Sequence, residues 1–171
     1  TRKRSSAASD VYKRQIHGLD SKPNKDKIEI IENYSTSYAL HLNYHNQPDS
    51  FNILSDLILN KGVNCIVGSS FGGMLGYWLA EKHKIPALLY NPALNIDNSI
   101  IHFEINHNKS PYKLIILGEK DKIVSPFYTN EFLKENLMET NYEIIKYPKL
   151  EHQIDINTFK ESSEYFYNKI L

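Results

Sequence analysis

The segment Gly68-Ser69-Ser70-Phe71-Gly72 constrains the fold of this chain more than any other feature. It follows an apolar run at 63–67, which predicts a short buried strand, and it precedes residues 73–82, which predict a helix. A strand, a G-x-S-x-G turn and a helix in this order are typical of a nucleophile elbow, a tight turn that raises a serine hydroxyl above a sheet. The turn needs glycine two residues before and after Ser70, because a side chain there would collide with the backbone.

Two other structures could give the same pattern. G-x-S-x-G occurs in ordinary strand-to-helix turns, and a glycine-rich loop before a helix can bind phosphate. No lysine follows the glycines as it does in G-x-x-x-x-G-K-[ST] loops, which counts against phosphate binding. We therefore expect a serine hydrolase elbow with Ser70 as the nucleophile. The N–H of Phe71, the next residue, is then one donor of the oxyanion hole.

An elbow of this kind predicts an acid and then a base later in the chain. Asp121 follows an apolar strand predicted at 113–117, and His152 follows a strand predicted at 142–147. Both lie just beyond the C-terminal end of a strand, where open α/β sheets bind their ligands. Glu119 is a rival for the acid, and an Asp after a strand can also be only a turn former or a helix cap. His152 is the only histidine after Asp121, which favours it as the base.

The remaining histidines receive no catalytic role. His17 lies in a loop at 16–20, where we expect it to buttress the backbone, although it could be mistaken for a base. The N–H of Leu19 in the same loop is the expected second oxyanion donor. Five histidines are expected at the surface or in loops, and their spacing forms no metal-binding motif: His41, His45, His83, His102 and His107. The predicted chemistry needs no metal and no organic cofactor.

Five segments of the chain resemble the YqiA/YcfP-type α/β-hydrolases, which are small lidless esterase-like proteins. They are HGLDSKP at 17–23, GSSFGG at 68–73, PALLYNPAL at 86–94, LGEKD at 117–121 and EH at 151–152. Asn91-Pro92-Ala93 is the part most specific to that family. The resemblance implies an esterase with Ser70, Asp121 and His152 as its triad. It also implies a doubly wound sheet of about six parallel strands in the order 2-1-3-4-5-6.

Strands and helices are predicted to alternate along the chain. The strands are expected at 37–42, 63–67, 87–90, 113–117 and 142–147, and the helices at 25–33, 50–60, 73–82, from Ser125-Pro126 onward and near the C-terminus. Only about twenty residues, 91–112, separate the fourth strand from the fifth, which is too short for a cap domain. We expect a flap or short helix there, and a single minimal α/β-hydrolase domain with a shallow, open site.

The first fifteen residues are expected to be a non-native tail, with the hydrolase domain at 16–171. Residues 5–15 match, in order, a translation of the transposase-end adapter used to prepare sequencing libraries. The alternative is a native basic tail or a transit peptide. In related hydrolases an apolar strand leads into the His-Gly loop. Lys13, Arg14 and Gln15 would occupy that interior strand here, where each unpaired charge costs several kcal/mol.

Composition excludes several classes of function. The formal net charge is zero, but residues 1–15 hold five basic and one acidic side chain, which leaves 15 basic and 19 acidic in 16–171, a net charge of −4. A mildly acidic domain has no electrostatic reason to bind nucleic acid or anionic membranes. The longest apolar runs are about five residues, far short of the ~20 that span a bilayer. Cys65 is the only cysteine, so it forms no intramolecular disulfide and is expected in the core. These features favour a cytoplasmic protein.

The sequence therefore predicts a carboxylesterase-like serine hydrolase, which cleaves a small-molecule ester or thioester through an acyl-enzyme. An acyltransferase or a peptidase could use the same triad. A binding protein that keeps the α/β-hydrolase fold without catalysis is a further alternative.

Overall fold

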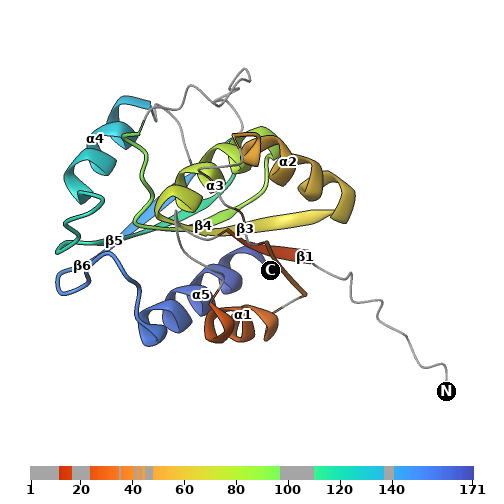
Figure 1. Cartoon of the computed structure of the whole chain (residues 1–171). Helices are drawn as coiled ribbons and strands as arrows, with labels where there is room; N and C mark the ends of the chain where they lie inside the picture. Colours follow the sequence, from red (N-terminus) through yellow and green to blue (C-terminus); the bar gives the residue numbers. More distant parts are fainter. Residues whose placement is uncertain are drawn as a thin grey trace.

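A six-stranded parallel sheet forms the centre of the molecule (Figure 1). The computed structural model describes residues 12–16, 24–34, 36–40, 42, 44, 48–96, 110–136 and 141–171. The strands are β1 (Tyr12–Ile16), β2 (Ser37–Ala39), β3 (Val63–Ser69), β4 (Ala87–Tyr90), β5 (Lys113–Gly118) and β6 (Tyr142–Tyr147). They lie in the order β2-β1-β3-β4-β5-β6, and every neighbouring pair is parallel. The α/β class and the expected strand order are confirmed.

In the described part of the chain, five helices cover the two faces of this sheet. They are α1 (Lys25–Glu32), α2 (Ser50–Lys61), α3 (Ser70–His83), α4 (Pro126–Asn136) and α5 (Ile156–Ile170). Helices α2, α3 and α4 lie on one face, and α1 and α5 lie on the other (Figure 1). Each face buries its own hydrophobic cluster against the sheet. The strands therefore need apolar side chains on both faces, as is usual for parallel sheets.

The predicted elements are confirmed with small shifts at their ends. Helix α2 ends at Gly62, which takes a left-handed φ of 59° as its C-cap. Helix α5 begins after Asp155, whose side chain accepts hydrogen bonds from the N–H groups of Asn157 and Thr158. The largest shifts are of three residues: α3 begins at Ser70 itself rather than at residue 73, and β2 ends at Ala39 rather than at residue 42.

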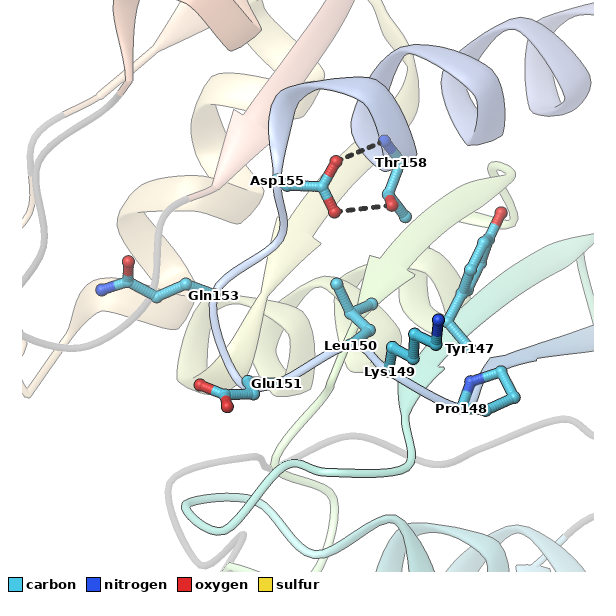
Figure 2. A pocket seen from close by; sticks show the side chains of 8 residues that line it. All are labelled: Tyr147, Pro148, Lys149, Leu150, Glu151, Gln153, Asp155 and Thr158. Atoms are coloured by element: carbon cyan, nitrogen blue, oxygen red, sulfur yellow. Dashed lines mark hydrogen bonds between the residues drawn. The ribbon is translucent and has the colours of Figure 1, made fainter.

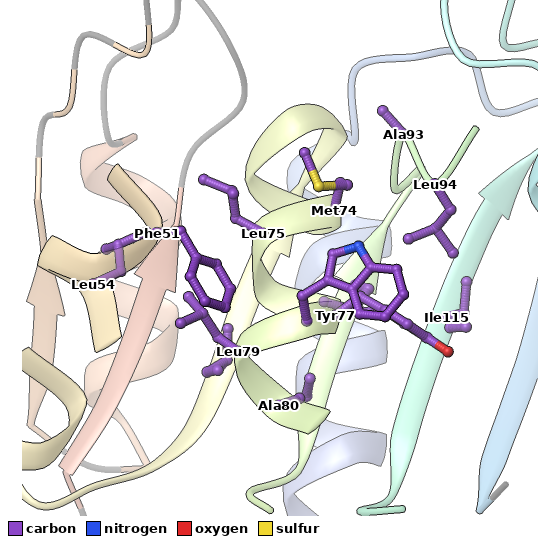
Figure 3. Packing of buried hydrophobic residues seen from close by; sticks show 14 of the residues in the cluster. Phe51, Leu54, Met74, Leu75, Tyr77, Leu79, Ala80, Ala93, Leu94 and Ile115 are labelled. Carbon is purple, nitrogen blue, oxygen red and sulfur yellow. The ribbon is translucent and has the colours of Figure 1, made fainter. Parts of the chain in front are cut away.

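Helix α3 lies at the centre of the larger hydrophobic cluster (Figure 3). Every residue from 72 to 81 in this helix is buried, which is the behaviour of a helix packed on all sides. Phe51 and Leu54 of α2 flank it, as do Leu94 and Ile115 from the β4 and β5 region. Fully burying one such side chain stabilises the fold by about 1.5–3 kcal/mol. The core therefore holds the start of α3, and with it Ser70, firmly in place.

Strand β1 lies between β2 and β3, so residues 13–15 occupy the interior strand that the sequence analysis assigned to them. Ile16 pairs with Gly68, which places the end of β1 beside the elbow. The loop at 17–23 and residues 97–109 of the segment 91–112, where a flap or short helix was predicted, lie outside the described residues. Cys65 is fully buried, as expected. Within the described part of the chain, no helix has the length and apolar character needed to cross a membrane.

Candidate active site

Ser70 stands at the junction of β3 and α3 in a backbone conformation that serine rarely adopts. Its φ is 53°, in the left-handed region, which costs a residue with a side chain roughly 1–3 kcal/mol. A Cβ added to Gly68 would lie 2.5 Å from the carbonyl oxygen of Gly72. Glycine is thus required two residues before Ser70, because the turn brings two backbone segments together there. This strained strand-to-helix turn has the geometry of a nucleophile elbow.

Phe71 is the second residue of α3, so its N–H is among the helix-starting groups that have no partner within the helix. The N-terminus of a helix also carries a partial positive charge, which favours a developing oxyanion. The expected second donor, Leu19, and the buttressing His17 lie outside the described residues. Of the two predicted oxyanion donors, Phe71 is therefore the one that the described residues include.

Asp121 and His152 form a hydrogen-bonded pair. The Nδ1 atom of His152 lies 2.7 Å from Oδ2 of Asp121. The other carboxylate oxygen, Oδ1, accepts hydrogen bonds from the N–H groups of Ile123 and Val124 at 2.8 and 2.9 Å. Because a carboxylate only accepts, Nδ1 carries the proton, and Nε2 is the nitrogen that can take one up. The His152 side chain is 21% exposed and that of Asp121 is fully buried, so solvent can reach the imidazole but not the carboxylate.

The loop that carries His152 lies directly against the end of β5. A Cβ at Gly118 would lie 2.5 Å from the carbonyl oxygen of Leu150 and 2.7 Å from that of Glu151. Glycine at this position therefore allows the loop to approach the strand closely. Glu119, the rival for the acid, is exposed, and Asp121 is the residue that accepts the hydrogen bond from Nδ1 of His152.

Within the described part of the chain, no hydrogen bond joins Ser70 to His152. The segment after β4 connects them instead. The N–H of Ala93 donates to the carbonyl of Ser70 at 3.0 Å, and Nδ2 of Asn91 donates to the carbonyls of Glu151 and His152, both at 3.1 Å. The segment 91–93 is the most family-specific part of the sequence, but no sequence pattern indicated a role for Asn91. The elbow and the Asp–His pair thus lie at the same edge of the sheet, on either side of the end of β4.

A cavity of about 530 Å³ adjoins the loop of the predicted base (Figure 2). Both chain neighbours of His152, namely Glu151 and Gln153, line it. The cavity continues to the start of α5, where Asp155 and Thr158 are hydrogen-bonded to each other. Its volume falls within the range of small-molecule sites. Sequence reasoning did not predict this cavity, because its lining depends on how the loop after β6 folds back on the strand.

Lys27 of α1 is a second feature that sequence reasoning missed. It lines a small cavity of about 10 Å³ together with Gly68 and Ser69, the two residues before the nucleophile. Burial lowers the pKa of Lys27, and the negative charge of Asp155 partly offsets that effect. The ammonium group lies 5.2 Å from the centre of the Phe159 ring of α5, a cation–π distance.

His83 differs from its expected position at the surface or in a loop. It is the last residue of α3 and is half-buried, with Nε2 2.8 Å from the hydroxyl of Ser55 in α2. Burial lowers the pKa of His83, and the nearby charge of Lys82 lowers it further. This serine–histidine hydrogen bond ties α2 to α3. The other histidines without an assigned role, His41, His45, His102 and His107, lie outside the described residues.

Comparison with known protein families gives one match over most of the chain. The model of the Uncharacterised protein family (UPF0227) matches residues 14–134. The matched range includes Ser70, Asn91 and Asp121, and ends before His152. It also includes the last three residues of β1, the strand next to the elbow.

Solved structures share the architecture at low sequence identity. A monoacylglycerol lipase from Paleococcus ferrophilus superposes with a TM-score of 0.65 at 17% identity, over 93% of this chain and 91% of the lipase. Est1E from Butyrivibrio proteoclasticus gives 0.65 at 16% identity, over 94% and 88% of the two chains. A predicted CIB-like hydrolase from Thermoplasma acidophilum gives 0.64 at 13% identity, over 96% and 88%. At these identities the similarity establishes the α/β-hydrolase fold.

Proposed function

This chain belongs to the UPF0227 family, the YqiA/YcfP-like group that its motifs resemble, and we propose that it is a serine hydrolase of carboxylic esters or thioesters. One observation carries the proposal. A strained serine at an elbow and a hydrogen-bonded Asp121–His152 pair lie at the same edge of the sheet. The order serine, acid, histidine along the chain is the order of α/β-hydrolases.

The proposed reaction proceeds through an acyl-enzyme. The hydroxyl oxygen of Ser70 bonds to the acyl carbon, and its proton passes to Nε2 of His152. His152 then gives that proton to the leaving alcohol or thiol as the bond to the acyl carbon breaks, and water repeats the sequence to release the acid. Asp121 orients the imidazole and stabilises its protonated form. Catalytic hydrogen bonds of this kind often tighten only with substrate bound, so the serine–histidine bond is expected in the complex.

The oxyanion is assigned to the N–H groups of Phe71 and Leu19. The first lies at the N-terminus of α3, where donors and helix dipole act together. The cavity beside the base is assigned to the leaving group, because the leaving group must receive its proton from His152 and the cavity includes both neighbours of that residue. Varying the leaving group at a fixed acyl group tests this assignment through KM.

The structural relatives support hydrolysis over the other uses of this fold. A monoacylglycerol lipase and a predicted CIB-like hydrolase share the arrangement of strands and helices. An acyltransferase or a peptidase would use the same three residues, and a binding protein would keep the fold without turnover. Hydrolysis rates on matched esters, thioesters and amides distinguish an acyltransferase or a peptidase from an esterase.

The direct test is hydrolysis of p-nitrophenyl esters of graded acyl length by the parent chain and two variants. Ser70→Ala should lower kcat by about 10⁶-fold, because the hydroxyl is the nucleophile. Ser69→Ala is the matched control, since it removes a hydroxyl from the adjacent residue, and it should remain active. Substantial turnover by Ser70→Ala would exclude Ser70 as the nucleophile, and absence of turnover by the folded parent would favour the binding protein.

A further inference from the structure

The side chain of Asn91 connects three chain segments at the catalytic edge. Its Oδ1 atom accepts a hydrogen bond of 2.7 Å from the N–H of Gly118, at the end of β5. Its Nδ2 atom donates to the carbonyls of Glu151 and His152, in the loop after β6. Asn91 itself follows β4, and its own N–H donates to the carbonyl of Ile116 in β5. One buried amide thus holds together the end of β4, the end of β5 and the loop of the base.

The site requires a carboxamide for a definite chemical reason. Two carbonyl oxygens and one N–H face the side chain, so it must supply two donors and one acceptor, which a neutral amide provides and a carboxylate does not. Asn91 is only 2% exposed, so lost partners could not be replaced by bulk water. Its φ of 40° is left-handed, a region that asparagine tolerates better than most residues.

These bonds act on the geometry of the proposed catalytic residues. The carbonyl of His152 and the N–H of Gly118 are fixed to the same amide, so the backbone of the base is set relative to the strand end that leads to Asp121. Two residues after Asn91, the N–H of Ala93 holds the carbonyl of Ser70. The segment that begins at Asn91 therefore has contacts to the nucleophile on one side and to the base on the other.

We propose that Asn91 is a positioning residue that places His152 for proton transfer with Ser70 while keeping it bonded to Asp121. The inference rests on the proposed function, because it assigns a task within the same site. Asn91 is not proposed to touch substrate. Its loss should therefore lower kcat with little change in KM, since substrate binding groups stay in place and the base moves.

Asn91→Asp is the sharpest variant, because it keeps the size and one acceptor but replaces the amide donors. With p-nitrophenyl esters, kcat should fall by about 10²-fold, the loss expected from a misplacement of about 1 Å. Proton NMR of the resting enzyme gives a second readout. The proton on Nδ1 of His152, bonded to Asp121, should give a far-downfield resonance in the parent that shifts or disappears in the variant.

Thr129→Val is the matched control. The buried Thr129 of α4 donates a 3.1 Å hydrogen bond to the carbonyl of Pro92, the residue directly after Asn91. The change removes a buried hydrogen bond to the same segment without touching the His152 loop. It should lower thermal stability while leaving kcat and the downfield resonance near parent values. Asn91→Gly, which accepts the left-handed φ, is the second variant in case the buried carboxylate prevents folding, and the same losses are expected from it.

The NMR readout separates this inference from the proposed function, because it requires no substrate. If the parent shows the resonance and the Asn91 variants lose it, the positioning role holds even where ester hydrolysis is absent. If folded Asn91→Asp or Asn91→Gly keeps both kcat and the resonance, or if Thr129→Val loses them equally, Asn91 has only a structural role and the inference is wrong.

Discussion

Two polar clusters lie at opposite edges of the same sheet, and they differ in what their hydrogen-bonding groups face. Where the strands begin, Glu81 of α3 and Lys113 of β5 are almost fully buried and form an ion pair. Ser110 and Lys84 also bond to the Glu81 carboxylate. The charged groups of this cluster are therefore bonded to one another. Where the strands end, the Asp121 carboxylate is satisfied, but the imidazole of His152 is partly exposed, and the chain neighbours of His152 line a cavity.

The difference separates a cluster that maintains the fold from one that can perform chemistry. Burial alone would raise the pKa of Glu81, but Lys113, Ser110 and Lys84 together outweigh burial, and the pKa lies below its ordinary value. Burial lowers the pKa of Lys113, and Glu81 offsets part of that effect. Each charge thus depends on the other. Changes at this edge should alter stability, whereas changes at the opposite edge should alter rate.

Between these two clusters, the largest expected effect is on rate, from Asp121→Asn. The new side chain can still accept from Ile123 and Val124 through its oxygen, so the loop should hold. Its NH₂ group would face Nδ1 of His152 and favour the wrong tautomer. We expect kcat to fall by about 10⁴-fold, as in the serine proteases, with the melting temperature nearly unchanged. Ester kinetics and a thermal melt on the same sample check this. Unimpaired turnover would remove Asp121 from the mechanism.

At the opposite edge, Glu81→Gln should affect stability instead. It leaves the ammonium of Lys113 buried without its counter-charge, which costs about 3–5 kcal/mol in the free energy of unfolding. The matched control is Glu131→Gln, which breaks the exposed pair with Lys134 and should cost at most about 1 kcal/mol. Denaturant unfolding measures both.

Turnover by the remaining folded Glu81→Gln enzyme should match the parent. Replacing both partners, Glu81→Leu with Lys113→Met, should recover much of the stability, because removing a buried pair together is often neutral. A kcat loss in Glu81→Gln as large as that in Asp121→Asn would contradict the division between the two edges.

Strand β1 extends the comparison, because Lys13 and Arg14 occupy an interior strand of the same sheet. The proposed tail assignment implies that apolar residues belong there. Replacing residues 1–15 with Met and a short β-branched strand ending at Ile16 should raise the melting temperature and, by fixing the Leu19 loop, the esterase rate. An oxyanion donor is worth about 10²–10³ in rate. Equal stability and equal activity of the two chains would mean that the present residues of β1 support the sheet as well as apolar residues would.

The smallest effect is the pH dependence of the Glu81 pair. A carboxyl whose folded-state pKa is lowered contributes stability that is present above its ordinary value of 4.5. That stability is lost as the pH falls through the folded value. The difference in unfolding free energy between the parent and Glu81→Gln should therefore shrink as the pH drops below 4.5. Urea unfolding at a series of pH values measures it, and a difference independent of pH would show that Glu81 does not act through its charge.

Local sequence signals predicted most of the fold and the three residues of the proposed triad. The elbow was predictable because glycine, serine and a following apolar helix are contiguous. Asp121 and His152 were predictable because each directly follows an apolar strand, and parallel strands end at one edge. The structure joins the two side chains by a hydrogen bond, and their catalytic roles remain a proposal.

Contacts that depend on the packing of distant segments were not predictable. Asn91 bonds to carbonyls 60 and 61 residues further along the chain, and nothing near it in sequence indicates those partners. Glu81 and Lys113 are 32 residues apart, and each resembles an ordinary surface charge until helix α3 is placed on β5. The start of α3 at Ser70 also depends on the strained turn, and helix propensities do not predict such a turn.

The most direct test of the central claim is to label the folded protein with a fluorophosphonate and map the modified residue by peptide mass spectrometry. The chain offers its own rival, because Ser55 is hydrogen-bonded to His83 but lies on helix α2 rather than at the strand ends. The account predicts a label on Ser70 alone, with labelling much slowed in Asp121→Asn. A label on Ser55, or no label on a folded parent chain, would contradict it.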